Sequence, residues 1–163
     1  MSTWPKIKTA SCAAESSADD GLPFANTIEV RDACLCLHVQ RAARILARRF
    51  DEALRPFDLT SGQFSLLVSL NRPEPPTIGS VATLLAMDRT TLTANLKPLE
   101  RRGLLKIAVD KDDKRGRRLI ITAAGRALLK KTYPTWKATH VEIEFSIARG
   151  SADQLRSSLR SLA

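Results

Sequence analysis

The segment that begins at Asp88 carries the side chains of this sequence that are best suited to polar recognition. A carboxylate at Asp88 can accept hydrogen bonds from the unpaired amide groups at the start of a helix. Hydroxyl, amide, ammonium and guanidinium groups near a helix start can bind phosphates or base edges in a DNA groove, and Arg can pair with guanine through two hydrogen bonds. The side chains that we expect to make such contacts are Arg89, Thr90, Thr91, Thr93, Asn95 and Lys97.

The same segment has a regular apolar side. Leu92, Leu96 and Leu99 recur at helical spacing, which predicts a helix from Asp88 to Arg102 with the leucines facing inward. The polar side chains then lie mainly on the outward side. An ordinary solvated helix face would give the same pattern, so this helix alone does not decide between solvent and DNA.

A second polar cluster, Asp110–Arg117, lies between two runs of alternating apolar residues. Leu104–Val109 and Arg118–Thr122 have the period of two that predicts half-buried strands, and Gly103 is the expected left-handed end of the preceding helix. The charged cluster would be the hairpin tip, with Asp110 and Asp113 holding it. The tip cations that we expect at DNA are Lys114, Arg115 and Arg117.

These elements follow a helix predicted at Ile78–Ala86, where apolar residues again recur at helical spacing. Helix, helix, strand, turn and strand form a winged helix-turn-helix, which places one helix in a DNA groove and a hairpin beside it. The predicted fold class is therefore mainly α with a small β-wing (α+β). Double-stranded DNA is the partner that this shape favours.

The chain resembles the MarR family of bacterial transcription regulators over about residues 30–163. The resemblance implies an obligate homodimer that reads a near-palindromic operator, acts as a repressor, and changes DNA affinity on meeting a ligand or an oxidant. The matching segments are Arg41–Arg44, Leu59–Phe64, Leu66–Leu67, Asp88–Thr93, Leu99–Leu104, Asp110–Arg115 and Leu119–Gly125.

Three residues depart from the family pattern. Ala94 stands where relatives often carry an Arg that contacts DNA, and Ala86 stands at a turn where Gly is frequent. Pro98 removes a hydrogen bond inside the expected recognition helix, at about 3 kcal/mol for a helix interior, so we expect a kink there.

The flanks predict long helices with apolar faces and little chain to cover them, which favours a second subunit. We expect helices at Val30–Arg55, Ser61–Leu70, 123–148 and 151–162. The predicted organisation is a disordered arm at 1–27, a helical dimerisation region at 28–58 and 122–163, and a DNA-binding domain at 59–121.

Composition agrees with this organisation. The 163 residues are 44% hydrophobic with a net charge of +9, and the part from Asp88 to Arg118 holds ten Lys or Arg against five Asp or Glu. A basic balance suits polyanions, although a ribosomal or membrane-surface protein would share it. No apolar run is long enough to span a membrane, so we expect a cytoplasmic protein without a membrane partner.

Two cysteines raise the possibility of redox regulation. Cys34 and Cys36 are two residues apart, so on one helix they would point to different faces and could not easily bridge. Cys36 falls where related organic-hydroperoxide regulators have their reactive cysteine, but Gln40 and Phe50 replace the supporting tyrosines. A thiol sensor is therefore the alternative to a ligand sensor.

An aromatic or phenolic effector is the reading that we favour, since the family implies a ligand site between dimer helices and DNA-binding domain. The residues that we expect to line it are Leu37, His38, Arg41, Phe64, Trp136 and His140. Each has a packing or surface role as its alternative.

Other functional classes fit less well. The sequence has no Gly-rich phosphate loop, nucleophile elbow or His-Glu-x-x-His motif, so we expect no enzyme, and neither a cofactor nor a metal site is indicated. A winged helix that binds protein would have an apolar outward face, whereas this one carries Arg and Thr.

Overall fold

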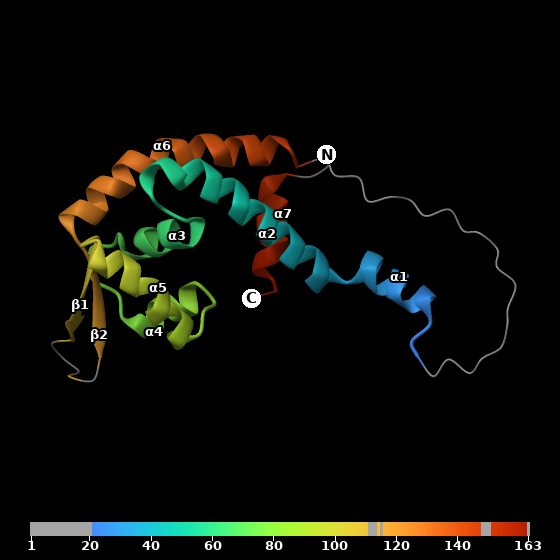
Figure 1. Cartoon of the computed structure of the whole chain (residues 1–163), viewed down its shortest axis with the longest axis horizontal. Coiled ribbons are helices and arrows are strands. Elements are labelled where there is room, and N and C mark those ends of the chain that lie inside the picture. The colour runs from blue at the N-terminus through green and yellow to red at the C-terminus, as the bar shows by residue number, and fades with distance from the viewer. Residues whose placement is uncertain (1–20, 111–113, 115, 148–150, 163) are drawn as a thin grey trace, which may run out of the picture. The chain divides into compact units, whose positions relative to one another are not determined.

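The structure, a computed structural model, describes residues 21–110, 114, 116–147 and 151–162 (Figure 1). Helices predominate, and a two-stranded antiparallel hairpin is the only sheet within these residues, which confirms the predicted fold class. The elements in chain order are α1 (Phe24–Ala33), α2 (Leu35–Leu54), a 3-10 turn (Arg55–Phe57), α3 (Ser61–Leu70), α4 (Ile78–Leu84), α5 (Arg89–Arg101), β1 (Leu105–Val109), β2 (Arg117–Ile121), α6 (Ala123–Phe145) and α7 (Ala152–Arg160).

The chain divides into two compact units, residues 1–39 and 40–163. Within the first unit, α1 begins directly after Pro23, so residues 24–27 are helical although we had assigned them to a disordered arm. The φ of Pro23 is −55°, and a proline at a helix start limits the conformational freedom that folding must overcome. Residues 1–20 lie outside the described part of the chain.

Cys34 interrupts the helix that we expected to run unbroken from Val30 to Arg55. Its ψ of 105° is extended, and its amide bonds the carbonyl of Val30 as the end of α1. The Cys34 thiol then accepts a hydrogen bond from the Leu37 amide at 3.5 Å and so caps α2. The premise that both cysteines point from one continuous helix is therefore wrong.

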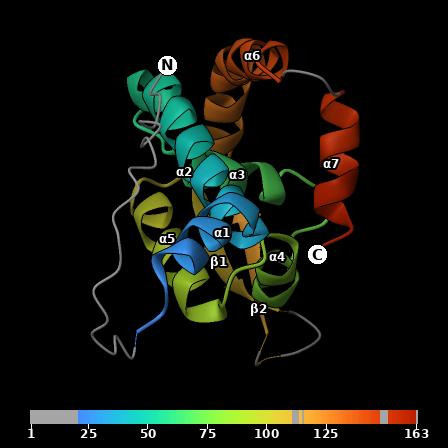
Figure 2. The same cartoon turned by 90° about the vertical axis from the view of Figure 1, so that its right-hand side faces the viewer.

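The core of the second unit is built around α3, which contacts α4, α5, α6 and β2 (Figures 1 and 2). Leu66, Leu67 and Leu70 are almost wholly buried there. Burial of such a side chain contributes about 1.5–3 kcal/mol, so α3 is the element against which the other helices are held. α3 itself starts at a capping box formed by Thr60 and Gln63.

The two strands of the wing pair antiparallel, so that Leu105 lies opposite Ile121 and Ile107 opposite Leu119. Leu105, Leu119 and Ile121 are buried, as their alternation predicted. Val109 shares their spacing but is 54% exposed, because the hairpin projects beyond the core at that end. Thr77 forms an isolated antiparallel bridge with Arg118, so the chain before α4 lies along the outer edge of β2.

Helix ends follow the local signals in most places. Asp88, Thr122 and Ser151 each accept an amide hydrogen bond at a helix start, and the first of these confirms the predicted cap at Asp88. α4 ends at Leu84, and Ala86 has a φ of 49°, a left-handed position that is strained for a residue other than Gly. Both α5 and α6 continue through their internal prolines.

A tight junction joins the end of α5 to the start of α6. Gly103 has a φ of 68°, as expected for the left-handed end of α5. Thr122 donates from its hydroxyl to the Gly103 carbonyl at 2.7 Å and from its amide to the Leu104 carbonyl at 3.1 Å. A Cβ on Gly125 would lie 2.2 Å from the Leu104 carbonyl oxygen, so no larger residue fits there without a backbone shift.

We predict that Gly125→Ala lowers the free energy of unfolding by about 1–3 kcal/mol or more, since the added methyl group meets backbone that cannot move aside. Gly62→Ala is the matched control, because the nearest atom to its new Cβ is 4.0 Å away. That control should stabilise α3 by about 0.5–1 kcal/mol. Urea unfolding of the two variants measures both effects, and equal stabilities would contradict the tight junction.

Candidate nucleic-acid interface

The start of α5 is held by a doubly bonded aspartate. Asp88 Oδ1 accepts the Thr91 amide at 2.7 Å, and Oδ2 accepts the Thr91 hydroxyl at 2.6 Å. The bond from the Thr91 hydroxyl and, to a smaller extent, the bond from the Thr91 amide lower the pKa of the Asp88 carboxyl below its ordinary value of 3.8. The charged carboxylate therefore fixes the first turn of the helix that carries the candidate side chains.

The two faces of α5 differ as predicted. Leu92, Leu96 and Leu99 are completely buried, and this fixes the rotation of the helix on the core. The predicted polar side chains, Arg89, Thr90, Thr91, Thr93, Asn95 and Lys97, are all exposed. The structure thus places these six side chains on one accessible helix. Ala94, which lies between Thr93 and Asn95, is exposed as well.

Not all of these side chains are equally available. The Thr91 hydroxyl proton serves the Asp88 cap, and the Thr93 hydroxyl donates to the Arg89 carbonyl at 2.7 Å. Each hydroxyl oxygen still has capacity to accept a hydrogen bond. Within the described residues, the side chains of Thr90, Asn95 and Lys97 make no hydrogen bond or ion pair, so they can meet a ligand without breaking one.

Arg89 lies against the neighbouring helix. A Cβ on Gly79 would be 3.3 Å from Arg89 Nη2, so the guanidinium crosses the first turns of α4 where a glycine leaves room. This position keeps a cation at the junction between α4 and α5, rather than at the centre of the exposed face of α5.

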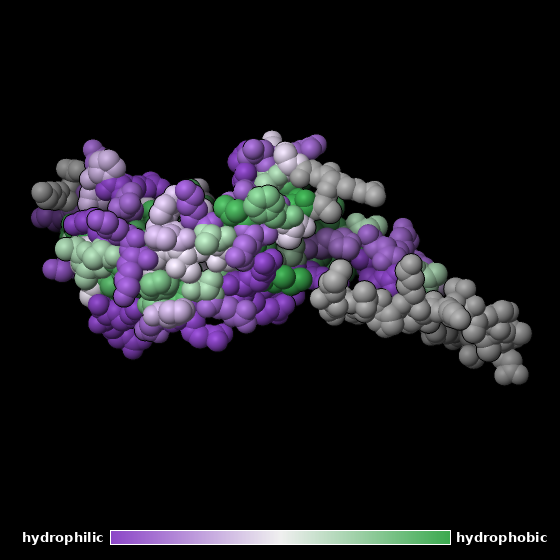
Figure 3. Space-filling model, turned by 90° about the horizontal axis from the view of Figure 1, so that it is seen from above, coloured by the Kyte–Doolittle hydropathy of each residue, from purple (hydrophilic) through white to green (hydrophobic). Residues whose placement is uncertain are grey.

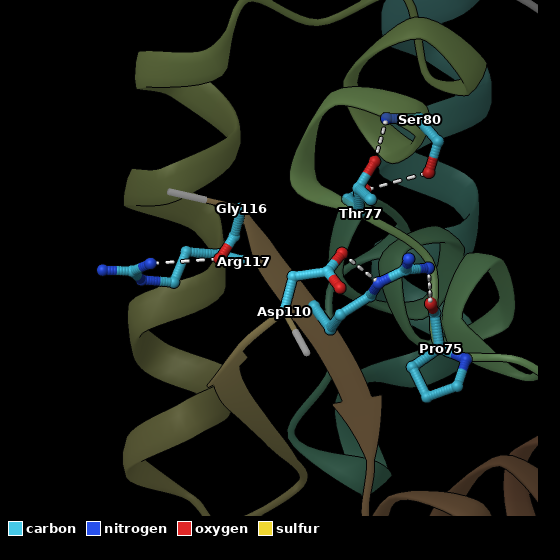
Figure 4. A network of polar contacts seen from close by, with 7 residues as sticks. Pro75, Thr77, Ser80, Asp110, Gly116 and Arg117 are labelled. Carbon is cyan, nitrogen blue, oxygen red and sulfur yellow. Dashed lines mark hydrogen bonds and ion pairs between the residues drawn. The ribbon is translucent and has the colours of Figure 1, made fainter. Parts of the chain in front are cut away.

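The wing supplies further basic groups. Lys114 and Arg117 are exposed, but Arg117 Nη1 donates to the Lys114 carbonyl at 3.1 Å. It also donates to the Gly116 carbonyl at 3.0 Å (Figure 4). Arg117 therefore shapes the tip as well as charging it. Arg115, together with Asp113, lies outside the described residues, so its predicted contact with DNA stays a prediction.

Sequence reasoning missed the role of Arg118. Its Nε donates to Asp110 Oδ2 at 2.5 Å and its Nη1 to the Pro75 carbonyl at 3.0 Å (Figure 4). The expectation that Asp110 holds the loop is confirmed, but the partner comes from β2 and the bond extends to a segment 43 residues away in the sequence. Alternation marked Arg118 only as a strand residue, and nothing local pointed to Pro75.

A cavity of about 530 Å³ opens between α3 and α6. Two of the six residues that we expected at an effector site, Phe64 and Trp136, line it. The complete lining is Phe64, Val68, Asn71, Arg126, Leu129, Lys130, Tyr133 and Trp136. Arg41 and His140 are not part of it, and Leu37 and His38 belong to the first unit, whereas every lining residue comes from the second. The lining residues that we missed, such as Lys130, carry no motif that distinguishes them from solvated positions on α6.

Trp136 is the centre of an aromatic cluster beside this cavity. Its ring stacks on Phe64 with centroids 6.1 Å apart, on Tyr133 at 5.9 Å and on His140 at 4.9 Å. His140 also pairs with Glu144, whose carboxylate bonds Arg156 of α7. The Arg156 hydrogen bond lowers the pKa of Glu144. His140 therefore takes part in joining α6 to α7, outside the cavity lining.

Two other kinds of site receive no support within the described residues. They contain no group of three or more His, Cys, Asp or Glu side chains placed to hold a metal ion. No described helix combines the length and the apolarity needed to cross a membrane.

Comparison with known proteins places these features in a family. The family model described as MarR family matches residues 59–116, from the loop before α3 to the wing. The M. tuberculosis transcriptional regulator MosR, crystallised in complex with DNA, is 36% identical, with a TM-score of 0.72 over 79% of this chain and 92% of that one. That identity extends well beyond the DNA-binding segment.

Two further relatives cover most of the chain. The transcriptional regulator SarZ of Staphylococcus haemolyticus is 27% identical over 77% of this chain and 84% of its own length. CouR from Rhodococcus jostii RHA1, solved with p-coumaroyl-CoA bound, is 23% identical, with a TM-score of 0.69 over 80% of this chain and 92% of that one. At that identity, CouR shows the shared fold alone.

The Asp88 cap predicts a specific dependence of stability on pH. Because folding lowers the Asp88 pKa, the carboxylate stabilises the folded state above the ordinary value of 3.8, and this contribution is lost as the pH falls through the lower folded pKa. We predict that Asp88→Asn, which keeps a capping oxygen but does not titrate, loses less thermal stability than the wild type between pH 6 and about pH 3. Parallel melting curves measure the difference. Identical pH profiles would show that the cap charge contributes nothing.

Proposed function

The chain belongs to the MarR family of DNA-binding transcription regulators, and from this premise we propose that it is a homodimeric repressor released by a small aromatic effector. The observation that carries the proposal is the capped helix α5, which buries three leucines and exposes its hydroxyl and cationic side chains beside a basic wing. Its relatives are transcription regulators rather than enzymes. The cytoplasm, where its DNA would be, is the compartment that this function implies.

The proposed DNA contact uses two kinds of group. Thr90, Asn95 and Lys97 on the exposed face of α5, with Arg89 at its start, enter a major groove, where hydroxyl, amide and guanidinium groups can distinguish bases. Arg115 and Lys114 on the wing bind the backbone, which positions the helix without reading sequence. The small side chain of Ala94 leaves space for a thymine methyl group where relatives place a cation.

The proposed dimer accounts for apolar side chains that the single chain leaves exposed. Among the described residues of α2 only Leu54 is buried, and α7 buries none. Figure 3 shows apolar side chains exposed among hydrophilic ones on one face of the molecule. The large exposed apolar side chains of α2, α6 and α7 in the second unit are Ile45, Leu46, Tyr133, Val141, Phe145, Leu155 and Leu159, with Leu162 just beyond α7.

A second copy of the chain is the occupant that we propose for these side chains. Phe145 is 87% exposed, and a soluble protein rarely leaves so many large apolar groups on neighbouring helices without a partner. A twofold dimer would hold two α5 helices about 34–36 Å apart, one turn of DNA, and would therefore select a near-palindromic site.

The cavity between α3 and α6 is the proposed effector site. Phe64, Leu129 and Trp136 offer apolar and aromatic surface, and its volume is in the range of about 300–1,000 Å³ that small-molecule sites occupy. Arg126 Nη1 already donates to the Ile121 carbonyl, whereas Lys130 makes no hydrogen bond or ion pair in the part that the structure describes. Lys130 is thus the group that we expect to hold an anionic substituent on an aromatic ligand.

A ligand in this cavity would change DNA affinity because α3 and α6, which line it, belong to different functional regions. α3 packs against the helices of the DNA-binding domain, while α6 leads to the proposed dimer region. A ligand that favours one spacing of α3 and α6 would shift the population towards dimers whose α5 helices no longer match the groove spacing. The bound p-coumaroyl-CoA of CouR supports an aromatic ligand as compatible with this fold.

Thiol sensing remains a second candidate, and one observation favours it. Cys34 lies outside regular helix and caps α2 through its sulfur, and Cys36 is exposed. Oxidation of the Cys34 thiol would change the hydrogen bond at the start of α2. This candidate uses a proposed dimer helix rather than the cavity.

We predict that loss of a base contact and loss of a backbone contact have different effects on DNA binding. Thr90→Ala or Arg89→Ala should reduce discrimination between the preferred duplex and random DNA, by about 1–3 kcal/mol where a bidentate contact is lost. Arg115→Ala should weaken binding to both duplexes alike and reduce the salt dependence by about one counterion. Titration of fluorescent duplexes at several salt concentrations separates the two effects.

Lys137→Ala is the charge control for Arg89→Ala and Arg115→Ala, because it removes one positive charge from an exposed position on α6 outside both surfaces. It should leave sequence preference intact. If Thr90→Ala and Arg89→Ala also leave the preference intact, bases are read elsewhere.

We predict that aromatic carboxylates quench the fluorescence of Trp136 and release the protein from its preferred duplex. Lys130→Ala should weaken ligand affinity by roughly tenfold or more in both assays, because a hydrogen bond to a charged group is worth about 1.5–3 kcal/mol. The panel would include benzoate, salicylate and 4-hydroxybenzoate, with Lys137→Ala as the charge control. An unchanged response in Lys130→Ala would remove this cavity from the proposal.

The same release assay with an organic hydroperoxide in place of the aromatic acid tests the second candidate. Cys34→Ser keeps a capping oxygen and Cys36→Ser keeps the size of the side chain, so both variants should fold. Equal release from wild type and both variants would exclude the thiols.

A further inference from the structure

The wing is joined to the segment before α4 by a side chain that crosses from strand to loop. Asp110 stands at the end of β1 with its side chain only 8% exposed, and Arg118 of β2 is its ion-pair partner at 2.5 Å. The same guanidinium donates to the Pro75 carbonyl at 3.0 Å. Arg118 therefore links both strands of the wing to a third part of the chain.

The backbone reinforces this link at the neighbouring position. The Leu119 amide donates to the Pro76 carbonyl at 2.9 Å, and Thr77 bridges Arg118 in antiparallel geometry. Proline has no amide hydrogen, so this segment can join β2 mainly through its carbonyls. Arg118 supplies the donor that backbone alone would not supply to Pro75.

The segment Pro75–Thr77, which these bonds hold against β2, directly precedes α4, and α5 follows α4. Thr77 is the N-cap of α4, accepting the Ser80 amide at 3.1 Å, and the Ser80 hydroxyl donates back to the Thr77 carbonyl at 2.9 Å (Figure 4). α4 in turn packs against α5. The orientation of the wing and the position of α5 are therefore set by one connected set of contacts.

We propose that Arg118 is a positioning residue for DNA binding, which through Asp110 and Pro75 holds the wing at a fixed angle to α4 and α5. The proposal rests on the proposed DNA contact and adds a residue that acts without touching DNA. A duplex that meets α5 and the wing together gains from contacts that are already arranged, since ordering them on binding would cost affinity. The Arg118 guanidinium also stabilises the almost buried Asp110 carboxylate, because burial of a charge is unfavourable unless the charge is paired.

The direction in which one substitution changes DNA affinity distinguishes a positioning role of Arg118 from direct contact with DNA. Asp110→Asn removes a negative charge, so by charge alone it should strengthen binding to DNA. If Arg118, released from Asp110, contacted a phosphate directly, binding should also become stronger. We expect instead that Asp110→Asn weakens binding to the preferred duplex on the order of tenfold and lowers the salt dependence by about one counterion, as wing contacts are lost. Glu74→Gln is the matched control, an exposed acid of the same segment, and should bind equally or more tightly.

A second readout needs no DNA. Amide hydrogen exchange at Leu119, which donates to Pro76, should become faster in Asp110→Asn, while Leu67 in the core of α3 keeps its protection. If Asp110→Asn lowers protection at Leu67 as well, Arg118→Lys is the variant to use. A lysine keeps the charge but lacks the planar guanidinium, two nitrogens of which bond Asp110 and Pro75 separately. This variant should show the same loss of affinity and the same local exchange.

Equal or tighter binding by both Asp110→Asn and Arg118→Lys would overturn the proposal, as would unchanged exchange at Leu119. A wild-type protein that binds no duplex would instead contradict the proposed function, while the exchange measurement would still report on the link.

Discussion

Burial of Leu92, Leu96 and Leu99 is the interaction on which the proposed DNA-binding surface depends. These three side chains are wholly removed from solvent, and each contributes about 1.5–3 kcal/mol to holding α5 against the core. Rotation of α5 about its axis would expose them, so the opposite face is fixed towards solvent. The polar side chains are available for DNA because the leucines allow the helix only one orientation.

The features that the sequence predicted are those with local physical causes. Asp88 caps α5 because a carboxylate there reaches the free amides of the first turn, and Gly103 ends it because a left-handed residue is required. The alternation of apolar residues predicted which side of each strand faces the core, and Leu105 and Ile121 are both buried there. The exposed face of α5 was predictable for the same reason.

The features that the sequence did not predict depend on contacts between distant segments or on weak local preferences. Neither Gly nor Pro marks the helix break at Cys34, where a thiol takes the place of a capping hydroxyl. The link from Arg118 to Pro75 spans 43 residues, and no periodicity identifies such a pair. The cavity lining was only partly foreseen, because Lys130 contributes to it through the packing of α6 on α3, which a linear pattern does not specify.

The central claim is that two copies of this chain present matched α5 helices to successive grooves of one duplex. Selection of bound duplexes from random DNA, followed by measurement of the mass of the complex in solution, tests it most directly. The account predicts two half-sites related by approximate twofold symmetry, about one turn of DNA apart, with two chains on each duplex. A single chain bound to an asymmetric site, or no enrichment of any sequence, would contradict it.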